Sequence, residues 1–192
     1  GPLARSAEDL KLALDVMAGP TKRESVGWKL DLAPAGIESL KGLRVAIWPT
    51  DELSPVCQEI EENAMQVGKV LEKCGASVSY TARPDFDAMK AYVTFVSLTA
   101  ATIASGHPAS ENEKIQRIVD KMDPEDTSMR AVRLRACVMS HRAWIRHNFR
   151  REKLRRAWDA FFQDWDVLIC PQYSVPAFPH DHRPLRERTC IV

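Results

Sequence analysis

A strand-like segment, a helix-like segment and a second strand-like segment follow one another in the first half of the chain. Residues 43–48 alternate apolar with other side chains, residues 54–74 place apolar side chains at helical spacing, and residues 77–81 alternate again. Two strands joined through one helix pair in parallel, with a right-handed crossover. The pattern therefore predicts the α/β fold class, in which helices cover a sheet.

The helix of this unit carries signals at both ends. Ser54 and Pro55 are typical of an N-cap and a first helical residue, and Gly75 stands where a glycine commonly ends a helix. We therefore expect the helix to run from residue 54 to residue 74.

Helical spacing predicts further helices at residues 6–18 and 126–164, and a helical stretch from 85 to 120 with a break at 106–108. Residues 166–170 (DVLIC) form a short apolar run closed by a proline, which predicts a third strand in the same sheet. The long helix should pack through an apolar stripe made of Ile145, Phe149, Leu154, Trp158, Phe161 and Trp165.

Charge and composition exclude some classes of partner. The 192 residues have a formal net charge of +1, so the whole molecule has no strong field to attract nucleic acid or anionic lipid. The uncharged helical stretch at residues 91–105 would span about 22 Å as a helix, against a bilayer core of about 30 Å. The cysteines are odd in number, lack a CxxC pair and favour a reduced, cytoplasmic setting; they are Cys57, Cys74, Cys137, Cys170 and Cys190.

One segment departs from this balance, because residues 129–156 hold ten basic side chains and one acidic residue, Glu152. The basic residues are Arg130, Arg133, Arg135, Arg142, Arg146, Arg150, Arg151, Lys153, Arg155 and Arg156. A basic helix could follow phosphates, with Trp144 and Phe149 stacking on bases. The alternative to an enzyme is thus a non-catalytic basic helical module that binds nucleic acid or an acidic protein. We favour a solvated helix face, because both aromatic residues belong to the apolar stripe.

Two other groups of reactive residues have ordinary interpretations. His180, Asp181 and His182 could offer ligands to a metal, but zinc needs further ligands and no CxxC or HExxH motif supplies them. We therefore predict a surface loop without a metal. Cys137 and His141 lie four residues apart on one helix and could resemble a nucleophile and its base, but packing is the expected role of both.

The loop that follows the predicted third strand is the candidate binding site. Loops that leave the carboxyl ends of sheet strands are where α/β folds place ligands. Within residues 171–178 (PQYSVPAF), Tyr173 and Phe178 are the candidate pocket walls.

Three segments carry motifs of a known family, in that family's order. Residues 1–20 (GPLARSAEDLKLALDVMAGP) resemble the GPxARSxEDLAL segment of amidase signature enzymes. Residues 40–49 (LKGLRVAIWP) are similar to a later strand, and residues 155–181 (RRAWDAFFQDWDVLICPQYSVPAFPHD) to a late helix, strand and proline-rich loop. The chain is identified by this resemblance as one partial amidase domain, residues 1–192.

The resemblance implies an α/β/α fold with helices on both faces of a mixed sheet, incomplete in this chain. About residues 1–81 and 126–192 match the family, and residues 82–125 form a variable helical excursion. The resemblance also places Tyr173 and Phe178 near the substrate pocket.

The resemblance further implies hydrolysis of a small linear amide by two serines and a lysine, without a cofactor, and leaves a homodimer open. In the family these catalytic residues lie in a Gly- and Ser-rich segment before the GPxARS motif. We therefore expect no catalytic residue here, and a fragment that is inactive alone.

Overall fold

The computed structural model describes residues 1–34, 36–184 and 187–189. The chain divides into two compact units, Gly1–Glu38 and Ser39–Val192. Cys190, the last of the five cysteines, lies outside the described residues.

The first unit contains helix α1 (Ala7–Met17) and a short 3-10 helix, η1 (Glu24–Val26). The helix begins at Ser6, whose hydroxyl oxygen accepts a hydrogen bond from the backbone N–H of Asp9 at 3.1 Å, as an N-cap does. The helix predicted over residues 6–18 is confirmed. None of its residues is buried.

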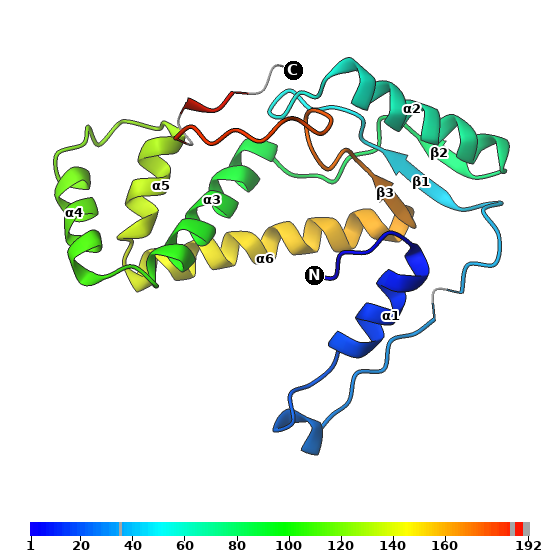
Figure 1. The fold of residues 1–192 in the computed structure, drawn as a ribbon, viewed down its shortest axis with the longest axis horizontal. Helices are drawn as coiled ribbons and strands as arrows, with labels where there is room; N and C mark the ends of the chain where they lie inside the picture. The colour runs from blue at the N-terminus through cyan, green and yellow to red at the C-terminus, as the bar shows by residue number, and fades with distance from the viewer. Residues whose placement is uncertain (35, 185–186, 190–192) are drawn as a thin grey trace. The chain divides into compact units, whose positions relative to one another are not determined.

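The second unit contains a sheet of three parallel strands (Figure 1). Strand β1 (Arg44–Ile47) lies between β2 (Ser77–Ser79) and β3 (Val167–Ile169). All three predicted strands and the α/β class are confirmed. The described strands pair only in parallel, whereas the family resemblance implied a mixed sheet.

The core forms where helix α2 (Gln58–Lys73) packs on one face of this sheet. Val45, Ile47 and Ala64 are its buried members. The half-buried residues packed around them are Leu43, Leu71, Ala76, Val78, Tyr80, Val167 and Ile169. Ala46 alternates to the opposite face and is also fully buried, and the C-terminal part of α6 (His141–Asp164) lies on that side of the strands in Figure 1.

The predicted start of α2 at Ser54 is wrong. The helix begins after Cys57, because residues 51–54 form a separate turn in which the N–H of Ser54 donates to the carbonyl of Asp51 at 3.1 Å. The carboxylate of Asp51 also accepts the N–H of Leu53 at 2.9 Å, a local bond that competes with helix. The predicted end is confirmed, since Gly75 follows the helix with φ at +86°.

Between β2 and β3 the second unit is mainly helical. Helices α3 (Ala88–Ala104) and α4 (Ala109–Val119) are separated at the predicted break. The single helix predicted over residues 126–164 is wrong, because α5 (Met129–Cys137) ends before α6 begins. The hydroxyl of Ser140 accepts the N–H of Ala143 at 3.2 Å, which starts α6 as a new helix.

Aromatic packing at the C-terminal end of α6 agrees with the predicted stripe. Trp158, Phe161, Phe162 and Trp165 contact one another through ring pairs 5.2–6.3 Å apart. Phe86, from the segment before α3, adds an edge contact to Trp158 at 5.6 Å. Phe149 was predicted in the same stripe, but 66% of its side chain is exposed, so it points away from the packed face.

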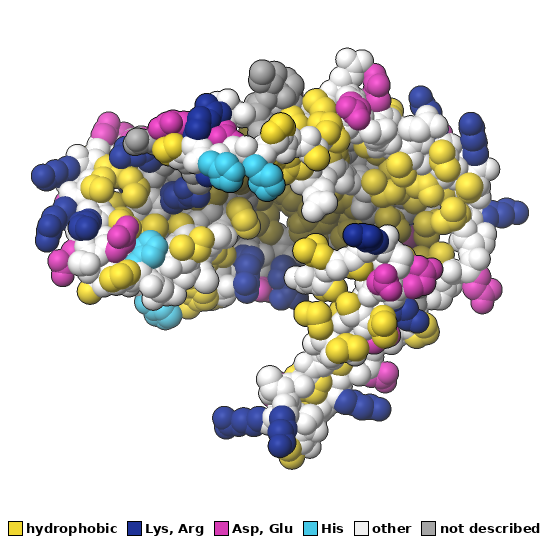
Figure 2. Space-filling model, in the orientation of Figure 1, with side chains coloured by type: hydrophobic (Ala, Val, Ile, Leu, Met, Phe, Trp, Pro, Cys, Tyr) yellow, Lys and Arg dark blue, Asp and Glu magenta, His cyan; other side chains and the backbone are white. Residues whose placement is uncertain are grey.

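Apolar surface remains open on the second unit. Figure 2 shows hydrophobic side chains gathered over α2 and the adjoining strands. Val67 and Val70 of α2 are 43% and 47% exposed. None of the described helices combines the length and apolar character needed to cross a membrane.

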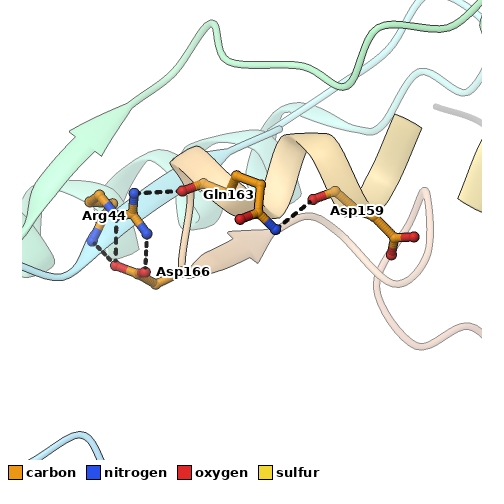
Figure 3. Close-up of polar contacts among 4 residues, drawn as sticks. All are labelled: Arg44, Asp159, Gln163 and Asp166. Atoms are coloured by element: carbon orange, nitrogen blue, oxygen red, sulfur yellow. Dashed lines mark hydrogen bonds and ion pairs between the residues drawn. The ribbon is translucent and has the colours of Figure 1, made fainter. Parts of the chain in front are cut away.

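Arg44 and Asp166 join the start of β1 to the start of β3 (Figure 3). The carboxylate of Asp166 accepts the Arg44 backbone N–H at 2.8 Å and the guanidinium Nη2 at 2.6 Å. The other guanidinium end, Nη1, donates to the carbonyl of Gln163 at 2.9 Å. In return, the backbone N–H of Asp166 donates to the carbonyl of Arg44 at 2.9 Å. One residue at each strand end thus sets the register of β1 against β3.

We predict that Asp166→Asn lowers the melting temperature near neutral pH and reduces its dependence on acid. Hydrogen bonds and the charge of Arg44 lower the pKa of Asp166 from 3.8 to about 2. The contact therefore stabilises the fold above pH 3.8, and this stabilisation is lost as the pH falls through about 2. Thermal melts from pH 7 to pH 2 should show the two proteins converging.

Asp159→Asn is the matched control, because the Asp159 carboxylate points away from Arg44 in Figure 3. Its melting temperature should stay within about 2 °C of the unchanged protein. Equal pH dependence of the Asp166→Asn variant and the unchanged protein would contradict the role given to this contact.

We further predict that Gly68→Ala destabilises the fold, although alanine normally favours a helix interior by about 1 kcal/mol. A Cβ atom at Gly68 would lie 2.6 Å from the Tyr80 hydroxyl and 2.8 Å from the ring carbon Cε1. Moving this packed ring should cost about 1–3 kcal/mol in the free energy of unfolding. Denaturant melts measure this free energy. In the double variant Gly68→Ala/Tyr80→Val, removal of the ring should offset part of the cost. Gly106→Ala is the control, and its free energy of unfolding should hardly change, because no side chain lies close to Gly106.

Candidate functional site

Two loops lie together at the carboxyl edge of the sheet. Parallel strands all point their carboxyl ends to the same edge, so the loops that follow β1 and β3 emerge side by side. The backbone N–H of Trp48 donates to the carbonyl of Ile169 at 2.8 Å. The N–H of Cys57, at the start of α2, donates to the carbonyl of Ser174 at 2.8 Å. These bonds hold the loop after β3 against the loop after β1.

An open hollow of about 380 Å³ lies between these loops. Its walls combine two aromatic residues with hydroxyl, amide and carboxylate groups. The lining residues are Trp48, Thr50, Asp51, Ser54, Val56, Cys170, Pro171, Gln172, Tyr173 and Ser174. A mostly apolar concave surface with a few polar groups is the usual form of a small-molecule site.

The two predicted pocket walls have different positions. Tyr173 lines this hollow and also a second one of about 330 Å³, which faces Ile60 and Val67 of α2. Phe178 lines neither hollow, but its ring centre lies 5.8 Å from that of Tyr173. The two side chains are therefore brought together, although only Tyr173 lines a hollow.

Arg83, from the segment after β2, supports the wall that Trp48 forms. Its guanidinium carbon lies 4.7 Å from the centre of the Trp48 ring, a cation–π distance. Its Nη1 donates to the carbonyls of Ile47 at 3.2 Å and Ala82 at 2.7 Å. Burial lowers the pKa of Arg83, and the charge of Asp51 opposes that shift. The segments that follow all three strands thus each contribute a residue to this edge.

Sequence reasoning missed Trp48, Thr50, Asp51 and Arg83. A signal was present for the first three, because they directly follow the end of a predicted strand, as the chosen loop 171–178 does. Arg83 could not be assigned in that way, since its place depends on the strand order and on the Trp48 ring.

The basic segment is divided between α5 and the first two-thirds of α6. Figure 2 shows Lys and Arg side chains on the part of the molecule where α4, α5 and α6 lie. Arg135 has a structural role, because its guanidinium donates to the carbonyls of Asp126 at 2.6 Å and Asp123 at 2.7 Å. Arg151 and Arg155 both lie within 3.5 Å of Glu152. Part of the basic charge is therefore paired.

The remaining reactive residues do not converge on the hollow. The carboxylate of Asp181 pairs with Arg183 at 2.6 Å, while the rings of His180 and His182 stack at 6.1 Å. Across residues 1–34, 36–184 and 187–189, no three His, Cys, Asp or Glu side chains are grouped as metal ligands.

Cys137 and His141 lie in different helical segments. Burial raises the pKa of the Cys137 thiol, which opposes formation of a reactive thiolate. His141 is exposed and stacks with Trp144, with 6.3 Å between the ring centres. Neither residue lines the hollow between the two loops.

Comparison with known proteins gives consistent matches over nearly the whole chain. The family model described as Amidase matches residues 1–191. A glutamyl-tRNA(Gln) amidotransferase subunit from Chromobacterium violaceum is 26% identical over 196 residues, covering 93% of this chain and 41% of that protein. Indoleacetamide hydrolase of Bradyrhizobium japonicum is 26% identical over 178 residues, covering 92% of this chain and 36% of its own length. No solved structure gives a significant match.

We predict that the basic segment gives no tight binding to nucleic acid. Arg135 is held by backbone carbonyls, the Trp144 ring stacks on His141, and the formal net charge of the chain is only +1, so long-range attraction to nucleic acid is weak. A dissociation constant no tighter than about 1 μM for a random oligonucleotide is expected at physiological salt, measured by fluorescence anisotropy. Tighter, steeply salt-dependent binding that Arg150→Ala/Arg151→Ala abolishes would contradict this.

Proposed function

The chain belongs to the amidase family, and from this membership we propose that it is part of an enzyme that hydrolyses the C–N bond of a small linear carboxamide. One matched relative is named a hydrolase of indoleacetamide and another an amidotransferase subunit. The chain spans 36% and 41% of these two relatives' lengths, so the activity is proposed for a protein that contains it.

The observation that carries the proposal is the hollow at the carboxyl edge of the sheet, with Tyr173 in its wall. Aromatic walls suit the apolar part of an amide substrate, because burial of a ring between Trp48 and Tyr173 removes apolar surface from water. Gln172 and Thr50 offer hydrogen-bond groups of the kind that a carboxamide needs. We assign substrate binding to Tyr173, supported by Phe178.

We assign no catalytic step to this chain. Acyl transfer needs a nucleophile, a base that activates it and donors for the oxyanion, all within hydrogen-bond reach. The described residues that line the hollow include serines but neither a lysine nor a histidine. The family resemblance implies that a Gly- and Ser-rich segment outside these 192 residues would supply these groups, as two serines and a lysine.

We predict that Tyr173→Ala, in a protein that joins this chain to such a segment, lowers kcat/KM about 10-fold or more for an aryl-substituted amide. The reason is the loss of one apolar wall, and the effect should be smaller for acetamide, which has little apolar surface to bury. Steady-state kinetics with both amides measure the difference. Phe178→Ala should give a weaker effect of the same kind, and Phe149→Ala is the matched control.

Two outcomes would contradict the proposal. Equal kinetics of Tyr173→Ala and Phe149→Ala would remove Tyr173 from the substrate site. Robust amide hydrolysis by residues 1–192 alone, abolished by Ser174→Ala, Cys137→Ala or His141→Ala, would place the active centre in residues to which we assign other roles.

A further inference from the structure

Helix α3 has its small side chains inside and its large ones outside. The buried residues are Thr94, Ser97, Ala100 and Ala104. The exposed large residues are Met89 at 45%, Tyr92 at 47%, Phe95 at 63% and Ile103 at 62%. Several large apolar side chains exposed on one helix commonly mark a binding surface.

This outer face borders a groove between α3 and α6, with a volume of about 400 Å³. The groove is lined mainly by apolar side chains and threonine methyl groups. Its residues are Ala91, Thr94, Phe95, Leu98, Thr99, Thr102 and Ile103 from α3, and Trp144, Arg151 and Leu154 from α6. At 1.5 Å per residue, the α3 wall from Ala91 to Ile103 is about 18 Å long, which suits three turns of another helix.

The charge beside the groove is mostly positive. Arg151 lines the groove and also lies 3.5 Å from Glu152, which is the one acidic residue among positions 141–158, beside seven Lys and Arg residues. On the other wall, the one charged residue of α3 is Lys90, which pairs with Asp87 at 3.1 Å just before the helix. An occupant with carboxylates along its edges would therefore meet complementary charge.

We propose that the groove between α3 and α6 docks an amphipathic helix of a partner protein, with an apolar stripe bordered by acidic residues. Phe95, Leu98 and Ile103 would receive the apolar stripe, as in other helix-in-groove complexes, while Arg151 would pair with a carboxylate at its border. A second copy of this chain fits less well, because two such grooves face to face would bring like charges together. The inference does not depend on the proposed amide hydrolysis.

The test uses residues 1–192 and a fluorescently labelled peptide of about 18 residues, long enough to form helix readily. The peptide carries leucines along one helical face and glutamates beside them. Two control peptides have the same residues in scrambled order, or lysine in place of glutamate. Anisotropy titrations should show saturable binding of the acidic amphipathic peptide, and at least 10-fold weaker binding of each control.

Variants of the protein then locate the site. Phe95→Glu should abolish binding, and Arg151→Glu should weaken it at least 10-fold, with circular dichroism confirming that both remain folded. Phe149→Glu is the matched control, because Phe149 is 66% exposed on α6 but does not line the groove. It should bind the peptide as the unchanged chain does.

Several results would overturn the proposal. One is the absence of saturable binding at about 100 μM peptide. Another is binding of the scrambled peptide as tight as that of the acidic amphipathic peptide. A third is a loss of peptide binding in Phe149→Glu as large as in Phe95→Glu. Sedimentation showing a dimer that Phe95→Glu dissociates would assign the groove to a second copy. Oligonucleotide binding that needs Arg151 but not Phe95 would assign the basic border to nucleic acid.

Discussion

The contact of Arg44 with Asp166 joins two segments that are 122 residues apart in the sequence. It combines an ion pair at 2.6 Å with backbone hydrogen bonds in both directions. The chain segment from α2 to α6 forms the loop that this contact closes. Closing a long loop costs little more entropy than closing a moderate one, so one well-formed contact between β1 and β3 can hold the sheet and a helical excursion together. The side chain of Asp166 is still about one-third exposed, so solvent weakens the charge interaction and the backbone bonds carry much of the geometry.

The candidate site depends on this register. When Arg44 fixes the start of β1 against the start of β3, the ends of the same strands are aligned, and Trp48 donates to the carbonyl of Ile169. The positions of the loops that form the hollow therefore depend on a contact at the opposite edge of the sheet. The hollow is open, and the strands beside it are short, with three or four residues each. Such a surface can receive further protein as well as a substrate.

Alternation and helical spacing predicted the strands and the existence of the helices, because those patterns reflect which side of each element faces the core. The predictions of helix boundaries were wrong where a tertiary or local hydrogen bond determines the residue at which a helix begins. Ser54 and Pro55 satisfy the rules for a helix start, but the turn at Asp51 and the bond from Cys57 to Ser174 move the start. Ser140, in contrast, was a visible capping residue inside the segment that was predicted as one helix. The hollow was partly predictable through Tyr173, whereas the position of Arg83 required the strand order.

Helix α6 links the two surfaces for which we propose roles. Its 24 residues span about 36 Å; Trp144 to Leu154 lie in the groove with α3, and Gln163, about 14 Å further along the axis, accepts the Arg44 guanidinium. Asp166 holds the same guanidinium from the next segment, so the end of α6 is tied to β1 at two points. Binding of a ligand in the groove could alter the sheet through α6 only if it broke these hydrogen bonds or moved β1 and β3 together. Since β1 is the most buried strand, moving it is costly, and we expect the two surfaces to bind their ligands independently.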